Sequence, residues 1–157
     1  MHWFVIQLAV VFALFFVSTV AAWYEGSAVL YDPWEWKYST PFSHVVYGNV
    51  EQASQITWLD HFVYAAKFQP LFPVLMTVSA LYVLFLIGCR LLKTHRIRAA
   101  YYFTALGLLS FIISFMLLDA LTIGGSIFFY VLLASGGMCF LFLYELFIRR
   151  EGGSMLT

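Results

Sequence analysis

Four long runs of apolar residues constrain this chain more than any other feature. They cover residues 5–22, 71–92, 99–118 and 123–148. Because an α-helix rises about 1.5 Å per residue, about 20 apolar residues cross the hydrocarbon core of a bilayer, which is about 30 Å thick. The pattern therefore predicts four transmembrane helices.

The composition excludes an ordinary water-soluble fold. The 157 residues are 63% hydrophobic and 10% charged, whereas soluble domains carry about 25% charged residues. A chain of this size cannot enclose so much apolar surface in a single core. We therefore predict one all-α integral membrane domain, residues 1–157. The formal net charge is zero, so the basic surface that nucleic-acid binding requires is not expected.

The first run has two interpretations. The small residues Val20, Ala21 and Ala22 before Trp23 resemble the cleavage site of a secretory signal peptide. However, no Lys or Arg precedes the run, and the run is longer than the apolar part of a typical signal peptide. We predict a retained transmembrane helix, and the cleaved signal is the alternative.

The segment between the first two runs, residues 23–70, is the only long stretch that water tolerates. It holds four of the five tryptophans. Within it, Trp34, Trp36 and Tyr38 alternate with polar residues. This period of two predicts a short strand with both indole rings on one face, and an extended loop on the bilayer surface is the alternative.

A short helix is predicted near the end of this segment. Thr57 and Asp60 have the spacing of a capping box, with Asp in place of the usual Glu, and the helix would end near Phe68. Its apolar residues are predicted to share one side: Leu59, Phe62, Val63 and Ala66. This pattern predicts an amphipathic helix in the membrane interface.

The basic residues predict the orientation. Six of them flank the loop between the second and third runs or follow the fourth run: Arg90, Lys93, Arg96, Arg98, Arg149 and Arg150. Only Lys37 and Lys67 lie on the other side if all four runs span. The positive-inside rule then places both termini in the cytoplasm and makes residues 23–70 an extracytoplasmic segment.

The sequence carries no catalytic or metal-binding signature. Potential metal ligands occur in the outer segment, but without the spacing that makes a metal site specific: His44, Glu51, Asp60 and His61. Ser43 next to His44 lacks the surrounding nucleophile motif. Both cysteines, Cys89 and Cys139, lie in apolar runs, so no disulfide is expected in segment 23–70. We predict no enzyme activity, no cofactor and no metal.

Small residues in the fourth run predict close helix packing. They lie at 124–126 and 134–137, where another backbone can approach. The expected neighbour is the first or third span, although a helix from a second copy in a homo-oligomer could use the same face. Nearer the end of this run, Glu145 precedes Arg149 by four residues, which predicts a helical ion pair rather than a proton relay.

Three stretches carry a resemblance to a known family. They are Trp23-Tyr24-Glu25-Gly26-Ser27, the block from Asp32 to Ser43 and the block from Phe62 to Pro70. Here the chain is similar to a family of small uncharacterised membrane proteins from endospore-forming bacilli, and the similarity is expected to cover most of the chain. The resemblance implies a bacterial cytoplasmic membrane and a four-helix fold. It implies no activity, because none is established for that family.

Two functional hypotheses follow. The preferred one is a non-enzymatic accessory protein that contacts a membrane or envelope protein, besides the lipid bilayer, through an aromatic surface of Trp34, Trp36 and Tyr38. Trp is the residue type most often found at the energetic centre of an interface. The alternative is a small permease or ligand-binding membrane protein with a cavity between its helices. A polar-lined cavity would favour the alternative.

Overall fold

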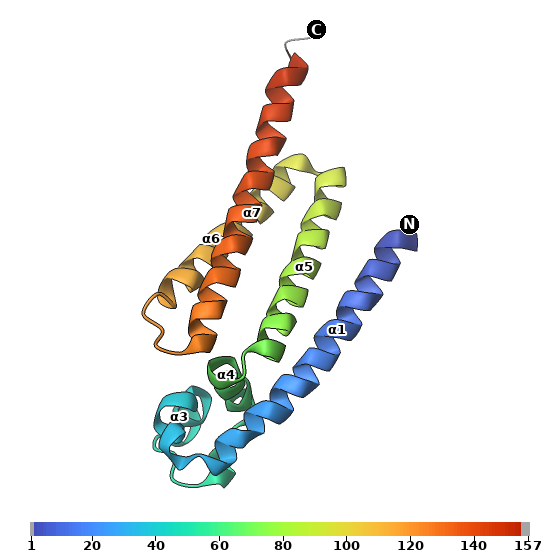
Figure 1. Cartoon of the computed structure of the whole chain (residues 1–157). Helices are drawn as coiled ribbons and strands as arrows, with labels where there is room; N and C mark the ends of the chain where they lie inside the picture. Colours follow the sequence, from blue (N-terminus) through green and yellow to red (C-terminus); the bar gives the residue numbers. More distant parts are fainter. Residues whose placement is uncertain (1, 155–157) are drawn as a thin grey trace. The chain divides into compact units, whose positions relative to one another are not determined.

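The computed structural model describes the backbone of residues 2–154 and the side chains of residues 2–145. Over this range the chain forms seven α-helices, three short 3₁₀ helices and no strand (Figure 1). The predicted all-α class is confirmed. The elements in chain order are α1 (His2–Gly26), η1 (Ser27–Tyr31), η2 (Pro33–Glu35), α2 (Trp36–Ser39), α3 (Pro41–Tyr47), η3 (Ala53–Gln55), α4 (Trp58–Phe68), α5 (Leu71–Thr94), α6 (Arg96–Met116) and α7 (Ile123–Ser154).

Within the part of the chain that the structure describes, four stretches are long and apolar enough to cross a membrane: His2–Tyr31, Leu71–Thr94, Arg96–Met116 and Ile123–Glu145. They coincide with the four predicted runs. Pro73 lies in the first turn of α5, where a missing N–H costs no helical hydrogen bond, so it does not interrupt the helix. A helix satisfies its own backbone groups, which is what a spanning segment requires in lipid.

The short strand predicted around Trp34 and Trp36 is wrong. This part of the chain forms η2 and α2 instead. A lone strand would leave its N–H and C=O groups without partners. Helical turns supply partners locally, as where the N–H of Glu35 donates to the carbonyl of Asp32 at 3.1 Å. Pro33 at the start of η2 already has the φ that a helical turn needs.

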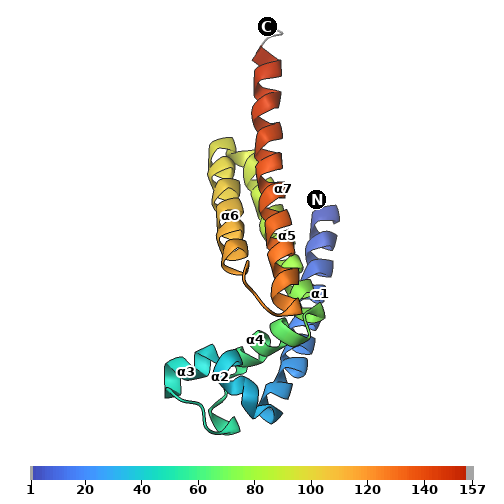
Figure 2. The same cartoon turned by 60° about the vertical axis from the view of Figure 1, so that its left-hand side comes forward.

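The chain divides into two compact units, Met1–Ala80 with Ala120–Ile127, and Leu81–Asp119 with Phe128–Thr157. In the first unit α4 packs across the end of α1 (Figure 2). The buried residues of α1 are small and four positions apart: Ser18, Ala22 and Gly26. A Cβ added to Gly26 would lie 1.8 Å from the carbonyl oxygen of His61. Small residues thus allow α1 and α4 to touch at backbone distance.

The small residues at the start of α7 have an unexpected neighbour. A Cβ added to Gly124 would lie 1.7 Å from the carbonyl oxygen of Ala66, so this end of α7 packs against α4 rather than against the first or third span. Further along, in the second unit, Gly136 lies against Phe111 and the carbonyl of Gly107 on α6. There the predicted packing against the third span is confirmed.

The second unit has an aromatic core where α5, α6 and α7 meet. Phe103 is fully buried, and its ring centroid lies 5.4 Å from that of Phe85 and 4.9 Å from that of Phe142. Two buried serines of α6, Ser110 and Ser114, take part in hydrogen bonds within this unit. Both therefore help to pack α6 against α7.

Candidate functional site: the helical segment between the first two spans

The carboxylate of Asp60 organises the segment. Asp60 is completely buried and accepts hydrogen bonds from the N–H groups of Phe42 at 3.0 Å and Ser43 at 2.9 Å. The hydroxyls of Ser43 and Thr57 donate to the same carboxylate, the latter at 2.8 Å. The first turn of α3 thus obtains from α4 the anionic acceptor that helix N-termini favour.

The predicted capping box at the start of α4 is therefore wrong. Thr57 is the N-cap residue, but its side chain makes no capping hydrogen bond to the α4 backbone. Its hydroxyl instead bonds the side chain of Asp60, and its N–H donates to the hydroxyl of Ser43 at 2.8 Å. Ser43 both donates and accepts here, so it joins α3 to the entry of α4 while leaving no buried hydroxyl unpaired.

Lys67 makes a second junction at the other end of α4. Its ammonium donates to the carbonyl of Tyr38 at 2.7 Å and to the hydroxyl of Ser39 at 2.9 Å. It lies 3.8 Å from a carboxylate oxygen of Glu35, which also accepts a hydrogen bond from Ser39 at 2.6 Å. α4 thus holds α3 through Asp60, and η2 and α2 through Lys67.

His61, on the inner side of α4, has a different environment. It is only 4% exposed, and its ring lies 5.9 Å from the ring of Trp23, which also packs edge-on against Trp58 at 6.2 Å. Neither ring nitrogen has a hydrogen-bond partner of good geometry. Burial lowers the pKa of His61, although the negative charge of Asp60 and the nearby backbone of Trp23 act in the opposite direction.

The three predicted partner-binding residues fall into two classes. Trp34 is 88% exposed and Tyr38 is 65% exposed, and Lys37 lies 5.6 Å from the centroid of the Tyr38 ring. Trp36 is half-buried, and its indole N–H donates to the carbonyl of Val29 at 2.8 Å. The two indoles therefore do not form the single aromatic face that a strand would have produced.

Several polar side chains of this segment are buried, while many of its large apolar ones are exposed. Asp60 and His61, two of the potential metal ligands of the sequence, are buried. His44 is half-buried, with its ring nitrogens against the carbonyls of Gly48 and Trp36. The exposed apolar residues of the segment include Tyr31, Trp34, Tyr38, Val45, Val46, Tyr47, Trp58 and Leu59. Sequence periodicity could not reveal this arrangement, because it depends on contacts between separate short helices.

Among the described residues, no group of three or more His, Cys, Asp or Glu side chains is placed to hold a metal ion. Asp60 already has backbone and hydroxyl donors, and His61 is enclosed by α1. Glu145 is exposed, and its predicted partner Arg149 lies outside the residues whose side chains are described.

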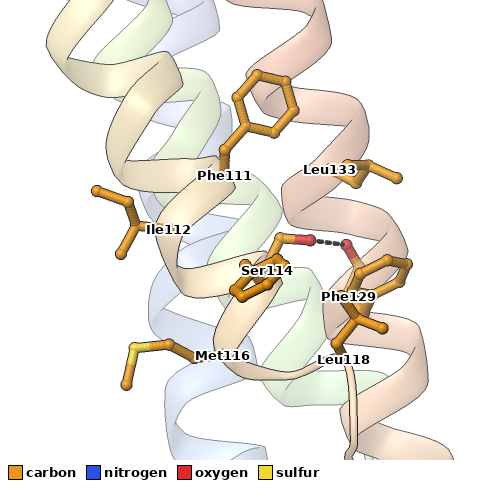
Figure 3. Close-up of a pocket in the computed structure, with 8 residues that line it drawn as sticks. Phe111, Ile112, Ser114, Met116, Leu118, Phe129 and Leu133 are labelled. Carbon is orange, nitrogen blue, oxygen red and sulfur yellow. Dashed lines mark hydrogen bonds between the residues drawn. The ribbon is translucent and has the colours of Figure 1, made fainter.

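A cavity of about 480 Å³ lies between α6 and α7 in the second unit. Its lining is apolar apart from Ser114, whose hydroxyl donates to the carbonyl of Phe129 at 3.0 Å (Figure 3). Phe111, Ile112, Leu118 and Leu133 supply much of the wall (Figure 3). A hydroxyl that is already paired offers little to a polar ligand, so this cavity suits a hydrocarbon group.

Comparison with known proteins identifies the part of the chain that is shared. Uncharacterized protein YjdJ of Bacillus subtilis (strain 168) is 37% identical over 82 residues, which are 51% of this chain and 75% of that protein. No solved structure matches the chain.

The family model matches residues 5–92. The resemblance was expected to cover most of the chain, but α6 and α7 lie beyond the matched residues. Every contact described above for Asp60, His61 and Lys67 lies within the matched residues. The expected resemblance to uncharacterised proteins of bacilli is confirmed: the chain belongs to the family described as "Domain of unknown function (DUF4306)".

Proposed function

We propose that this protein is a non-enzymatic, multi-pass accessory protein of the bacterial cytoplasmic membrane that binds a membrane or envelope protein through Trp34 and Tyr38. The observation that carries the proposal is the exposure of these two rings, 88% and 65%, on a segment whose polar groups bond to one another. Large exposed apolar side chains on an ordered surface commonly mark an interaction site.

Contacts that hold the backbone near Trp34 and Tyr38 favour a binding role for these two residues. Lys67 bonds the backbone of Tyr38 directly, and Trp36, two positions after Trp34, is tied to Val29. A backbone that is already ordered loses less conformational entropy when a partner covers the side chains it carries. Trp36 supports this surface, so our proposal narrows the predicted binding set to Trp34 and Tyr38.

The contacts of α4 support its assignment to the membrane interface. Gly26 at the end of α1 and Gly124 at the start of α7 both touch its backbone, and α5 begins at Leu71, soon after α4 ends. The ends of three candidate spans thus meet at this helix. Its exposed large apolar residues are Trp58, Leu59 and Phe68, of which Trp is typical of the headgroup region.

The orientation belongs to the same proposal. The exposed cations Lys93, Arg96 and Arg98 lie at the junction of α5 and α6, and the positive-inside rule assigns this junction to the cytoplasm. Segment 27–68, which runs from the start of η1 to the end of α4 and makes up most of the predicted 23–70 segment, would then face outward with Trp34 and Tyr38. The cavity between α6 and α7 gives no support to a permease, because its lining offers no unpaired polar group.

The proposal is tested by crosslinking in native membranes followed by purification of the tagged protein. Trp34→Ala and Tyr38→Ala should each reduce recovery of a specific crosslinked partner while leaving the melting temperature unchanged. Tyr24→Ala is the matched control, because Tyr24 is 74% exposed at the end of α1 but outside the proposed surface. Full partner recovery by both variants would refute this binding surface.

A further inference from the structure

We propose that His61 makes the packing of α4 against α1 sensitive to acidic pH. Where the proposed function holds, His61 would thereby regulate the Trp34–Tyr38 surface. The inference begins with the position of His61 in the first unit. Its backbone touches Gly26, its ring faces Trp23, and only 4% of the residue is exposed. A proton added to this ring would place a positive charge where solvent is excluded and where neither ring nitrogen has a hydrogen-bond partner.

The surrounding groups compensate for that charge only in part, because the effect of burial on the pKa of His61 outweighs those of Asp60 and of the Trp23 backbone. Asp60 is the ionisable neighbour on α4, but its carboxylate already accepts hydrogen bonds from α3 and Thr57. The other charged or imidazole groups near α4 include Glu25 on α1, which has one buried carboxylate oxygen without a hydrogen-bond partner, Lys37 on α2 and His44 on α3. Two further pairs involve α4 itself: Glu35 with Lys67 and Asp32 with Tyr64. Both pairs are made through other α4 side chains, and His44 contacts carbonyls within its own part of the segment.

The direction of the pH effect follows from linkage. Burial lowers the pKa of His61 in the packed state below its ordinary value near 6.5, whereas an opened α4 restores the ordinary value. Above that value His61 is neutral in both states and pH has no effect through this group. As pH falls below about 6.5, the opened state binds the proton first, so acid favours opening.

The opening would reach the rest of the segment through α4. Asp60 is the residue next to His61 and holds the first turn of α3, while Lys67, six positions further along, holds Tyr38, Ser39 and Glu35. A displacement of α4 from α1 therefore changes the support of both α2 and α3. The imidazole is the natural group for such a response, because its pKa lies closest to neutral pH among the unperturbed side chains.

The test uses the full-length protein in vesicles of phosphatidylethanolamine and phosphatidylglycerol, with Cys89 and Cys139 replaced. A reporter cysteine is introduced by Val29→Cys, because Val29 is fully buried in η1, which packs on α4. Its reaction rate with a thiol reagent is divided at each pH by the rate of an exposed control, Gln52→Cys. We expect this ratio to rise several-fold between pH 7.5 and pH 5.

Two substitutions of His61 separate its titration from any change in packing. Neither Phe nor Gln titrates in this pH range. In reporter proteins that carry His61→Phe or His61→Gln, the reactivity ratio should therefore be independent of pH. His44→Gln is the control for the other histidine of the segment and should retain the pH response. The proposal would be overturned if the ratio rose equally in the His61 variants. It would also be overturned if the ratio stayed constant in the reporter protein that keeps His61.

A second measurement covers the case in which both His61 variants fold poorly. Opening removes α4 from the Trp23 ring, so the Trp23 emission, obtained as the difference from a Trp23→Phe variant, should shift to longer wavelength over the same pH range as the reactivity ratio rises. A Trp23 emission wavelength that stays constant over this range would show that α4 remains on α1 and would reject the switch. These measurements involve no partner, so their failure is distinct from failure of the Trp34–Tyr38 binding surface.

Discussion

Asp60 accepts hydrogen bonds from both the N–H and the hydroxyl of Ser43, although 17 positions separate the two residues. This contact explains how α3, a helix of seven residues, forms at all. Isolated helices shorter than about 12 residues are marginal in water. The first turn of α3 gains its stabilising anion from α4, so the two helices depend on each other.

The first prediction concerns this contact. Asp60→Asn removes the negative charge and one acceptor from a completely buried site. We expect the free energy of unfolding to fall by about 1–3 kcal/mol, because a buried N–H or hydroxyl is left without a good acceptor. Denaturant titration in detergent micelles measures this change. Glu51→Gln, at an exposed position, is the control and should stay within about 0.5 kcal/mol of wild type; equal stability of both variants would contradict the prediction.

The second prediction concerns the backbone contact between α1 and α4. Gly26→Ala places a methyl group 1.8 Å from the His61 carbonyl oxygen unless the helices separate, and we expect a loss of about 1–3 kcal/mol. Gly137→Ala is the matched control, since nothing lies within 4 Å of the added carbon and Ala is the better helix former. Thermal unfolding followed by circular dichroism should separate them. A melting temperature for Gly26→Ala at or above that of Gly137→Ala would show that this packing is absent.

The third prediction separates the two neighbouring indoles. Trp36→Phe loses the hydrogen bond to Val29 and should cost about 1 kcal/mol, whereas Trp34→Phe at an 88% exposed position should change stability by less than about 0.5 kcal/mol. The same unfolding measurement on both variants gives the comparison. The supporting role assigned to Trp36 would be untenable if its substitution were as mild as that of Trp34.

The fourth prediction concerns topology. Single cysteines at Gln52 and Thr94, both exposed positions, are introduced after Cys89 and Cys139 are replaced. In intact cells an impermeant thiol reagent should label the cysteine at Gln52 and leave that at Thr94 unmodified, because the positive-inside rule places the α5–α6 junction in the cytoplasm. After the cells are broken open, both should react. Labelling of Thr94 in intact cells would reverse the proposed orientation.

The parts of the structure that were predicted correctly are those whose signal lies within a single stretch of the sequence. The four long helices follow from runs of apolar residues, and the helix that ends at Phe68 lies where it was predicted, although its capping box does not form. The capping box at Thr57 and the strand at Trp34–Tyr38 failed for a related reason. Both predictions used local spacing, whereas the side chain of Asp60 bonds α3 and Trp36 bonds Val29. A local pattern does not contain the partner on another element.

The amino-acid sequence by itself determined the long helices, because a segment in lipid must satisfy its backbone internally and needs only length and apolar side chains to do so. Only the tertiary structure decided which side chains of segment 27–68 face inward. The burial of His61 depends on Gly26, 35 positions earlier, and the burial of Asp60 depends on the first turn of α3. Short helices are stable only through such contacts, so their faces are set by packing partners rather than by their own periodicity.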